Sequence, residues 1–160
     1  MARLHGRNGT RAGRHSFTGC SYGGLGGQPL LKLLLDTHVW IWSLLEPQKL
    51  SRLARKELED LKNQLWLSPI SIWETIVLHR KGRIDLGPDP YVWIETALNK
   101  APIREAPLNI SVAVLSEKLA LRWKDPADLF IAATAVVYDL VIISRDSHFQ
   151  RRTDFHVIKA

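Results

Sequence analysis

Four acidic residues stand beside or within apolar segments that lie far apart in the chain: Asp36, Glu74, Asp128 and Asp146. Asp36 is the clearest case, because the apolar run 33–35 precedes it and the run 39–42 follows almost at once. A buried carboxylate without a partner is costly, so proteins usually neutralise it, pair it with a cation or bind a metal ion with it. The chemistry of these residues therefore depends on whether the fold brings their carboxylates together.

Some of these positions also have an ordinary structural interpretation. Asp36 could be the N-cap of the helix that follows it, and Asp146 could be a turn residue; for both, the structural and the functional interpretation stay open. Asp125 and Asp128 are three residues apart and resemble a capping pair at the start of the next helix. Capping is the interpretation we favour for Asp125.

Glu74 is harder to explain as a structural residue. It lies four residues after Ile70 and four before Leu78, so it shares the apolar stripe of a predicted helix. No Lys or Arg stands three or four residues away on either side to form an ion pair with it. We therefore expect the Glu74 carboxylate to face a positively charged group outside its own helix.

Four carboxylates at one place would repel one another. Two unit charges about 4 Å apart cost about 4 kcal/mol at an effective dielectric near 20, so such a cluster needs a bound cation or protonated members. Oxygen ligands without a cluster of His or Cys favour Mg²⁺ or Mn²⁺ over zinc. The six histidines show no paired zinc spacing, and we expect His38 to be a packed or hydrogen-bonded side chain rather than a ligand.

The hydrophobic pattern predicts strands that alternate with helices, which is typical of an α/β protein. Strands are predicted at 31–36, 64–68, 140–144 and 155–160, with a short extended piece at 103–108. Helices are predicted at 37–46, 51–63 with Leu53, Leu58 and Leu61 on one stripe, 70–82, 91–100, 109–120 and 125–139. This alternation predicts three layers, with a mostly parallel sheet of four or five strands covered by helices on both faces.

Composition divides the 160 residues into a tail and one domain. Residues 1–29 contain eight of the ten glycines, four arginines and no acid, and we expect this segment to be a disordered basic extension. Residues 30–160 form the predicted folded domain. The tail supplies four of the six net positive charges, so the domain itself shows no strong signal for a polyanion.

Several functional classes are disfavoured by the same composition. The tail lacks the apolar middle region of a secretory signal, and no apolar run approaches the roughly 20 residues that cross a bilayer. The single cysteine, Cys20, cannot form an internal disulfide. We therefore expect a cytoplasmic protein without a membrane partner.

Four segments together resemble the motifs of the PIN-domain family, and most closely those of VapC-type toxins of type II toxin–antitoxin pairs. They are "LLLDTHVWIW", "LSPISIWE", "DPADLFIAATA" and "LVIISRDSHF", in this order and at similar spacing, and the resemblance covers residues 31–160. It departs from the family at Leu129, where an arginine often follows the third acid, and in the N-terminal tail. The first departure bears on a basic residue next to the site and leaves the acids in place.

The resemblance implies a metal-dependent endoribonuclease, the toxin of such a pair. The acids that match the family's metal-binding and catalytic positions are Asp36, Glu74, Asp128 and Asp146, with Mg²⁺ or Mn²⁺ as the cofactor. Residues that would support them are Thr37, Asp125 and Ser144. The implied partners are an RNA substrate, a cognate antitoxin protein and a second copy of the chain. The alternative is a catalytically inactive PIN domain that binds RNA or a protein partner.

Aromatic and basic residues are also expected near the predicted site. Trp40 and Trp42 cannot both point inward, because residues two apart lie on different faces of a helix; one of them is expected to meet a second subunit or the antitoxin. Four basic residues are expected near the rim of the site, where they could bind the RNA backbone or simply be solvated: Arg80, Lys81, Arg83 and Arg145.

Overall fold

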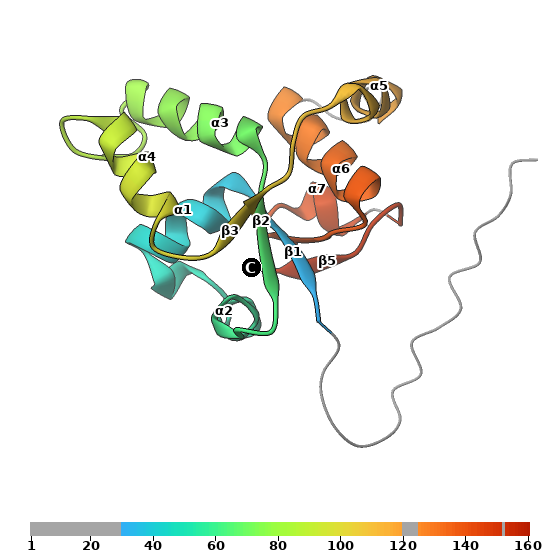
Figure 1. Cartoon of the computed structure of the whole chain (residues 1–160), viewed down its shortest axis with the longest axis horizontal. Helices are drawn as coiled ribbons and strands as arrows, with labels where there is room; N and C mark the ends of the chain where they lie inside the picture. The colour runs from blue at the N-terminus through green and yellow to red at the C-terminus, as the bar shows by residue number, and fades with distance from the viewer. Residues whose placement is uncertain (1–29, 120–124, 152) are drawn as a thin grey trace, which may run out of the picture.

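A five-stranded parallel sheet forms the middle layer of the protein, with helices on both sides of it (Figure 1). The computed structural model describes residues 30–119, 125–151 and 153–160. The strands are β1 (Lys32–Leu35), β2 (Gln64–Leu67), β3 (Ile103–Glu105), β4 (Val141–Ser144) and β5 (Val157–Lys159). The helices are α1 (Thr37–Leu45), the 3₁₀ helix η1 (Pro47–Lys49), α2 (Arg52–Glu59), α3 (Pro69–Arg80), α4 (Pro90–Leu98), α5 (Ile110–Leu119), α6 (Pro126–Tyr138) and α7 (Ser147–Gln150).

The strand order is β3-β2-β1-β4-β5, and every neighbouring pair is parallel. The chain thus moves outward from β1 to β3 and then returns to place β4 on the other side of β1. This confirms the predicted three-layer α/β fold with its parallel sheet. The short extended piece predicted at 103–108 contains the edge strand β3, which makes the sheet five-stranded.

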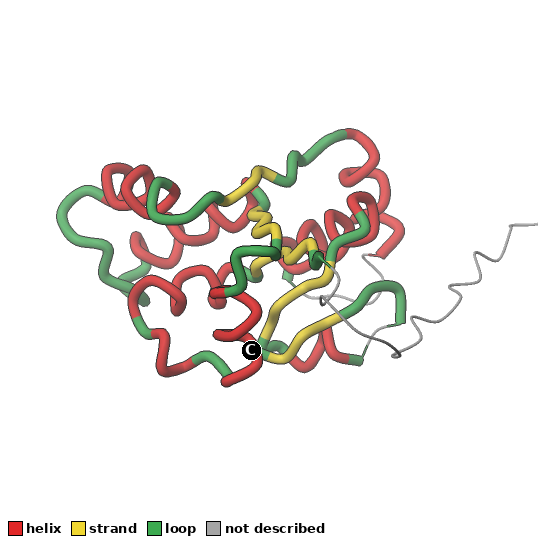
Figure 2. The backbone as a smooth tube through the Cα atoms, turned by 60° about the horizontal axis from the view of Figure 1, so that its bottom comes forward, coloured by secondary structure: helices red, strands yellow, loops and turns green. Residues whose placement is uncertain are grey.

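Alternation of side chains along β1 connects the two halves of the core. Leu33 and Leu35 are buried in one hydrophobic cluster, which also contains residues of α1 and α4, whereas Leu34 is buried in a second cluster with Ile131 and Ala135 of α6. Figure 2 shows the strands in the middle with helices around them. Burial on both faces explains why β1 and β4 are almost continuous apolar runs.

The ends of α3 follow from local sequence. Ser68 is the N-cap, and its hydroxyl accepts a hydrogen bond from the Ile70 amide at 3.4 Å, while Pro69 takes the first helical position. Gly82 follows the last turn with a φ of +67°, a conformation that favours glycine. The predicted capping of this helix is confirmed, and these ends fix the position of Glu74 on it.

The predicted apolar stripe on α2 is wrong. Leu53 is 53% exposed and Leu61 is 97% exposed, and the helix ends at Glu59 instead of continuing to residue 63. The reason is Asn63, whose amide donates to the Glu57 carbonyl at 2.9 Å and whose Oδ1 accepts from the Leu31 amide at 3.1 Å. This side chain ends the helix and joins it to the start of β1.

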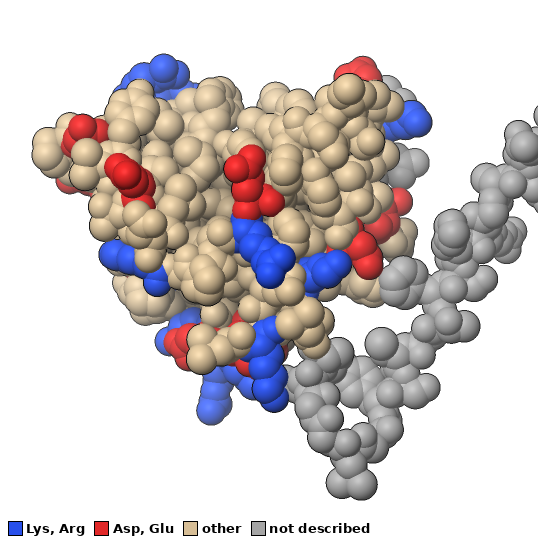
Figure 3. Space-filling view, viewed as in Figure 1, with Lys and Arg blue, Asp and Glu red and all other residues tan. Residues whose placement is uncertain are grey.

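Part of what the sequence predicts lies outside the described residues. The expected disorder of residues 1–29 belongs to this part, as does the last residue of the helix predicted at 109–120. Among the residues that the structure describes, no helix is both long and apolar enough to cross a membrane. On the face shown in Figure 3, Lys and Arg side chains stand in separate groups, with acidic side chains between them.

Candidate active site

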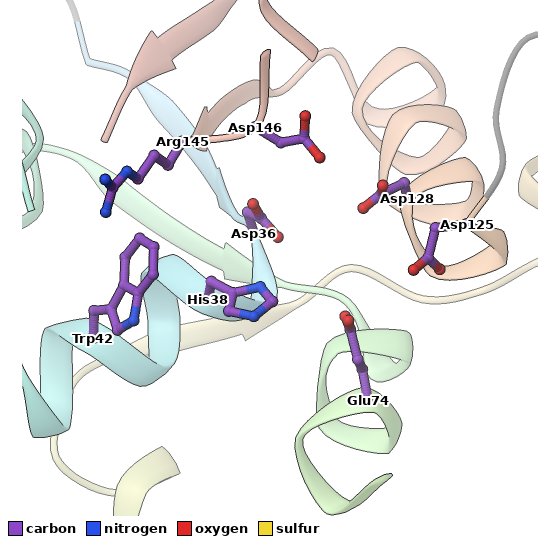
Figure 4. A pocket seen from close by; sticks show the side chains of 8 residues that line it. All are labelled: Asp36, His38, Trp42, Glu74, Asp125, Asp128, Arg145 and Asp146. Atoms are coloured by element: carbon purple, nitrogen blue, oxygen red, sulfur yellow. The ribbon is translucent and has the colours of Figure 1, made fainter. Parts of the chain in front are cut away.

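The strand order creates a natural binding position between β1 and β4. The connections from these two neighbouring strands lead in opposite directions, and ligands of open α/β sheets bind at such a point, beyond the carboxyl ends of the strands. Asp36 follows β1 directly, and Asp146 comes two residues after β4. A cavity of about 390 Å³ lies here, which we call the acidic pocket. Its lining residues are Asp36, His38, Trp42, Glu74, Asp125, Asp128, Arg145 and Asp146 (Figure 4).

Asp36 is the most deeply buried acid of the pocket. It occupies the N-cap position of α1, but its side chain makes no capping hydrogen bond, and the residue is only 6% exposed. Its Oδ2 instead accepts a hydrogen bond of 2.6 Å from the Ser144 hydroxyl. Burial raises the pKa of Asp36 above its ordinary value, against the opposing effects of Ser144 and His38. The capping interpretation of this side chain is therefore wrong.

Ser144 holds two of the acidic segments together. Its Oγ donates to Asp36 and accepts a hydrogen bond of 2.9 Å from the backbone amide of Asp146. The ends of β1 and β4 are thereby connected through one buried hydroxyl. The predicted supporting position of Ser144 thus has a direct contact in the structure. Thr37 is fully buried as well, but within the described part of the chain its Oγ1 has no hydrogen-bond partner.

Asp128 lies in the first turn of α6, and its carboxylate points into the pocket (Figure 4). Burial, followed by the negative charges of Asp36 and Asp125, raises the pKa of Asp128 to about 8. Asp146 and Glu74 add smaller contributions in the same direction. An acid that shares the pocket with several others thus keeps its proton at neutral pH while no cation is present.

Asp125 has the capping role that the sequence favours. It is the N-cap of α6, and its Oδ1 accepts a hydrogen bond of 2.9 Å from the amide of Ala127. Its carboxylate nevertheless lines the acidic pocket, and its charge raises the pKa of Asp128. Asp125 is therefore a cap that also adds negative charge to the site.

Asp146 also has a structural role as the N-cap of the short helix α7. Its Oδ1 accepts hydrogen bonds from the amide of His148 at 2.7 Å and pairs with Nδ1 of the same residue at 2.8 Å. Partial burial alone would raise the pKa of Asp146, but the contacts with His148 outweigh it and hold this pKa below its ordinary value. Asp146 therefore stays ionised where Asp128 does not.

Glu74 reaches the pocket from the opposite side, on α3 (Figure 4). Its side chain is half-buried, and in the described part of the chain no ion pair neutralises it. The structure thus brings together all four acids that the sequence singles out, from four separate segments. Their roles in metal binding and catalysis stay predictions.

The other wall of the pocket is formed by His38, Trp42 and Arg145 (Figure 4). His38 is exposed and lies beside the Trp42 ring, with 5.7 Å between ring centroids. That it is a packed or hydrogen-bonded side chain and not a ligand stays a prediction. Trp40 is buried, whereas Trp42 is half-buried, lines the pocket and also packs against the core cluster that contains Trp40. The expected contact of one of them with a second subunit or the antitoxin stays a prediction. Sequence spacing does not reveal that Arg145 lies against Trp42, because about one hundred residues separate them.

The chemistry of the acidic pocket fits a divalent cation, although its geometry is not ready-made. Among the described residues, no three His, Cys, Asp or Glu side chains are already arranged to hold a metal ion. The groups at the centre of the pocket that could bind a metal ion are nevertheless all carboxylates, which suit Mg²⁺ or Mn²⁺. Burial, and after it the neighbouring negative charges, raise the pKa of Asp36 and Asp128, and a bound cation would offset both effects.

Fold and site together define a PIN domain. The family model "PIN domain" matches residues 33–155, and the chain belongs to this family. A curated relative, Ribonuclease VapC22 of Mycobacterium tuberculosis, is 31% identical over 115 residues, which are 71% of this chain and 86% of the relative.

Two solved VapBC structures have the same fold. VapBC-1 from nontypeable Haemophilus influenzae matches with a TM-score of 0.62 and 21% identity, over 81% of this chain and 98% of that chain. VapBC2 from Rickettsia felis, bound to a DNA fragment from its promoter, matches with a TM-score of 0.61 and 14% identity, over 81% and 99%. At these identities the two structures support the fold alone.

Proposed function

We propose that this protein is a metal-dependent endoribonuclease and the toxin of a toxin–antitoxin pair. The observation that carries the proposal is the convergence of four carboxylates from distant segments on one pocket, with the pKa of Asp36 and Asp128 raised. The similarity to Ribonuclease VapC22 supports RNA as the substrate. The neighbouring complexes support an antitoxin protein as the partner.

In the proposed reaction a water molecule attacks the phosphorus of an RNA phosphodiester, and the 3′ oxygen leaves. Asp36, Glu74, Asp128 and Asp146 would hold Mg²⁺ or Mn²⁺, which supplies charge neutralisation at the phosphate and activation of the water. Ser144 keeps the Asp36 carboxylate in a fixed orientation. The Asp128 carboxyl, protonated at neutral pH without a cation, releases its proton before it can act as an anionic ligand.

The proposal extends to assembly and location. We propose that the protein is cytoplasmic and meets its RNA substrate in the cytoplasm. Exposed apolar side chains on α3 and α4, among them Trp73 (56%) and Tyr91 (68%), would be covered by the antitoxin or by a second copy of the chain. In this proposal the bound antitoxin inhibits the nuclease.

The test is cleavage of total RNA by the purified protein with Mg²⁺ or Mn²⁺, compared with the same reaction in EDTA. We expect Asp36→Ala and Asp128→Ala to lose cleavage by about 100-fold or more, because several kcal/mol of transition-state stabilisation would be lost. Glu117→Ala is the matched control, because it removes an exposed acid of α5 that does not line the pocket.

Two results would contradict the proposal in different ways. If Asp36→Ala and Asp128→Ala cut as well as the parent, the activity belongs to another site or to a contaminant. If the parent binds RNA but cuts none with either metal ion, the protein is the catalytically inactive binding module that the sequence leaves as the alternative.

A further inference from the structure

Arg145 is unusual among the residues of the acidic pocket. Of the described Lys and Arg residues it alone lines this pocket, together with five carboxylates. Within the described part of the chain it nevertheless forms no ion pair with any of them. Its guanidinium carbon lies instead 5.7 Å from the centroid of the Trp42 ring (Figure 4). The charge of Arg145 is thus available to an anion that enters the pocket.

Trp42 accounts for this position of the guanidinium. A cation over an indole ring is attracted by the ring quadrupole, and α1 holds the half-buried Trp42 beside the pocket. A second cation, Lys49, lies 5.9 Å from the same ring, but its Nζ is 2.7 Å from Glu46 and is already neutralised. Of the two cations at Trp42, only Arg145 is therefore suited to bind an anionic ligand.

The acidic pocket also continues past Trp42. An adjoining cavity of about 600 Å³ shares His38 and Trp42 with it and extends to Lys49 and Arg83. A chain-like ligand that occupies both cavities passes Trp42, the residue beside which the Arg145 guanidinium lies. A planar guanidinium with several donors matches a phosphate group better than it matches a neutral ligand.

We propose that Arg145 binds a phosphate of single-stranded RNA next to the bond to be cut, and that Trp42 is the positioning residue that holds its guanidinium there. This inference rests on the proposed function and names the residues that receive the RNA backbone. It assigns no base contact to Trp42, because Arg145, Lys49 and His38 already lie beside its ring.

The test measures RNA binding separately from cleavage. The full chain carries Asp36→Asn and Asp128→Asn as a background, which removes two of the proposed metal ligands and with them cleavage, so that binding can be measured without a metal ion. The probe is a fluorescein-labelled single-stranded RNA of about ten nucleotides. Its affinity is measured by anisotropy in EDTA between about 50 and 200 mM KCl. A thermal melt of each variant shows that it is folded.

We expect Arg145→Gln to weaken RNA binding about tenfold at low salt, since a charge-assisted contact is lost. The slope of log affinity against log salt should decrease by about 0.7, the value for one phosphate contact to a single strand. Arg145→Lys should keep this slope. Trp42→Leu should weaken binding about threefold when Arg145 is present and should have no further effect in Arg145→Gln. Trp42→Phe, which keeps a ring face, should restore most of the affinity.

The structure offers a matched control pair. Arg104 lies 5.7 Å from the Trp66 ring, the same arrangement and distance, but it lines neither of the two cavities. Arg104→Gln should therefore leave affinity and salt slope unchanged. Equal losses in Arg104→Gln and Arg145→Gln would reduce the effect to net charge and overturn the proposal.

Two further outcomes would also overturn it. Unchanged binding in Arg145→Gln means that the arginine does not contact the RNA. Equal losses for Trp42→Leu with and without Arg145 mean that Trp42 touches RNA itself and does not act through Arg145. A parent chain that binds RNA in this way but never cuts it would refute the nuclease proposal and leave the assignment of Arg145 and Trp42 standing.

Discussion

Burial and neighbouring charge act in the same direction on the carboxyl of Asp128, and this makes its protonation a property of the whole pocket. Its pKa is raised to about 8 in the folded chain, whereas an aspartate of the unfolded chain titrates near pH 4. The folded chain therefore binds a proton that the unfolded chain has already lost over this interval. By linkage, the contribution of Asp128 to the stability of the metal-free protein falls as pH rises from about 4 to about 8, and it levels off above.

This linkage predicts the effect of Asp128→Asn. In EDTA, the melting temperature of the parent should decrease more steeply between about pH 5 and pH 8 than that of the variant, by a few degrees for a chain of this size. The difference is kept modest because Asp128 is only partly buried and solvent screens its charge. Asp36 and Asp146 titrate in both proteins, so the comparison isolates Asp128. Parallel melting curves across this range would show that the pKa of Asp128 is not raised.

For single residues, the sequence predicts which acids lie at the pocket but not which side chains contact them. The position of Glu74 at a charged site could be predicted, because a carboxylate on an apolar stripe without a cation on its own helix must face a group outside that helix. The exposure of His38 and its contact with Trp42 could not, because they depend on which face of α1 meets the pocket. The hydrogen bonds of Ser144 to two acidic segments likewise depend on the register of β1 beside β4.

The start of helix α6 lies at the acidic pocket. Asp125 caps it through one hydrogen bond to Ala127 and also contributes negative charge to the pocket. These two roles can be separated, because asparagine caps a helix about as well as aspartate but carries no charge. The separation decides whether Asp125 belongs to the helix alone or also to the electrostatics of the site.

We expect Asp125→Ala to lower the free energy of unfolding by about 1 kcal/mol, the usual cost of losing an N-cap. Asp125→Asn should stay within about 0.5 kcal/mol of the parent in urea unfolding. The same Asp125→Asn variant should lower the pKa of Asp128, measured by NMR titration of its carboxyl carbon, because one of the raising charges is removed. An unchanged pKa would limit Asp125 to capping, and an equal loss of stability in both variants would argue against capping.

Helix ends could be predicted well from the sequence and buried faces less well. Ser68 with Pro69 marks the start of α3, because the serine hydroxyl accepts a hydrogen bond from a free backbone amide and proline has no amide hydrogen that needs a partner. The three leucines assigned to one face of α2 were misleading, because the Asn63 side chain ends the helix before the third of them. The same side chain joins the end of α2 to the chain entering β1, and the hydrophobic pattern of the sequence does not reveal such a contact.

For the whole molecule, the position of the acids has an energetic consequence. Asp36 and Asp146 follow adjacent strands, Glu74 comes from α3, and Asp128 comes from α6 on the other side of the sheet (Figure 1). These segments meet only in the folded chain. A divalent ion held by them would connect the layers on both sides of the sheet, so its binding free energy would add to the stability of the fold.

We therefore expect Mn²⁺ or Mg²⁺ to raise the melting temperature of the full chain at pH about 7.5, where ion binding must displace the proton of Asp128. An ion at about 100 times its Kd stabilises by about 2.7 kcal/mol, or about 5 to 10 °C here. The shift should be larger at pH about 8 than at pH about 6, because less proton is displaced. The double variant Asp36→Asn, Asp128→Asn should lose the shift, whereas Glu117→Ala should keep it. A shift that survives in the double variant would place the ion elsewhere on the protein, and the acidic pocket would then need another explanation for its charge.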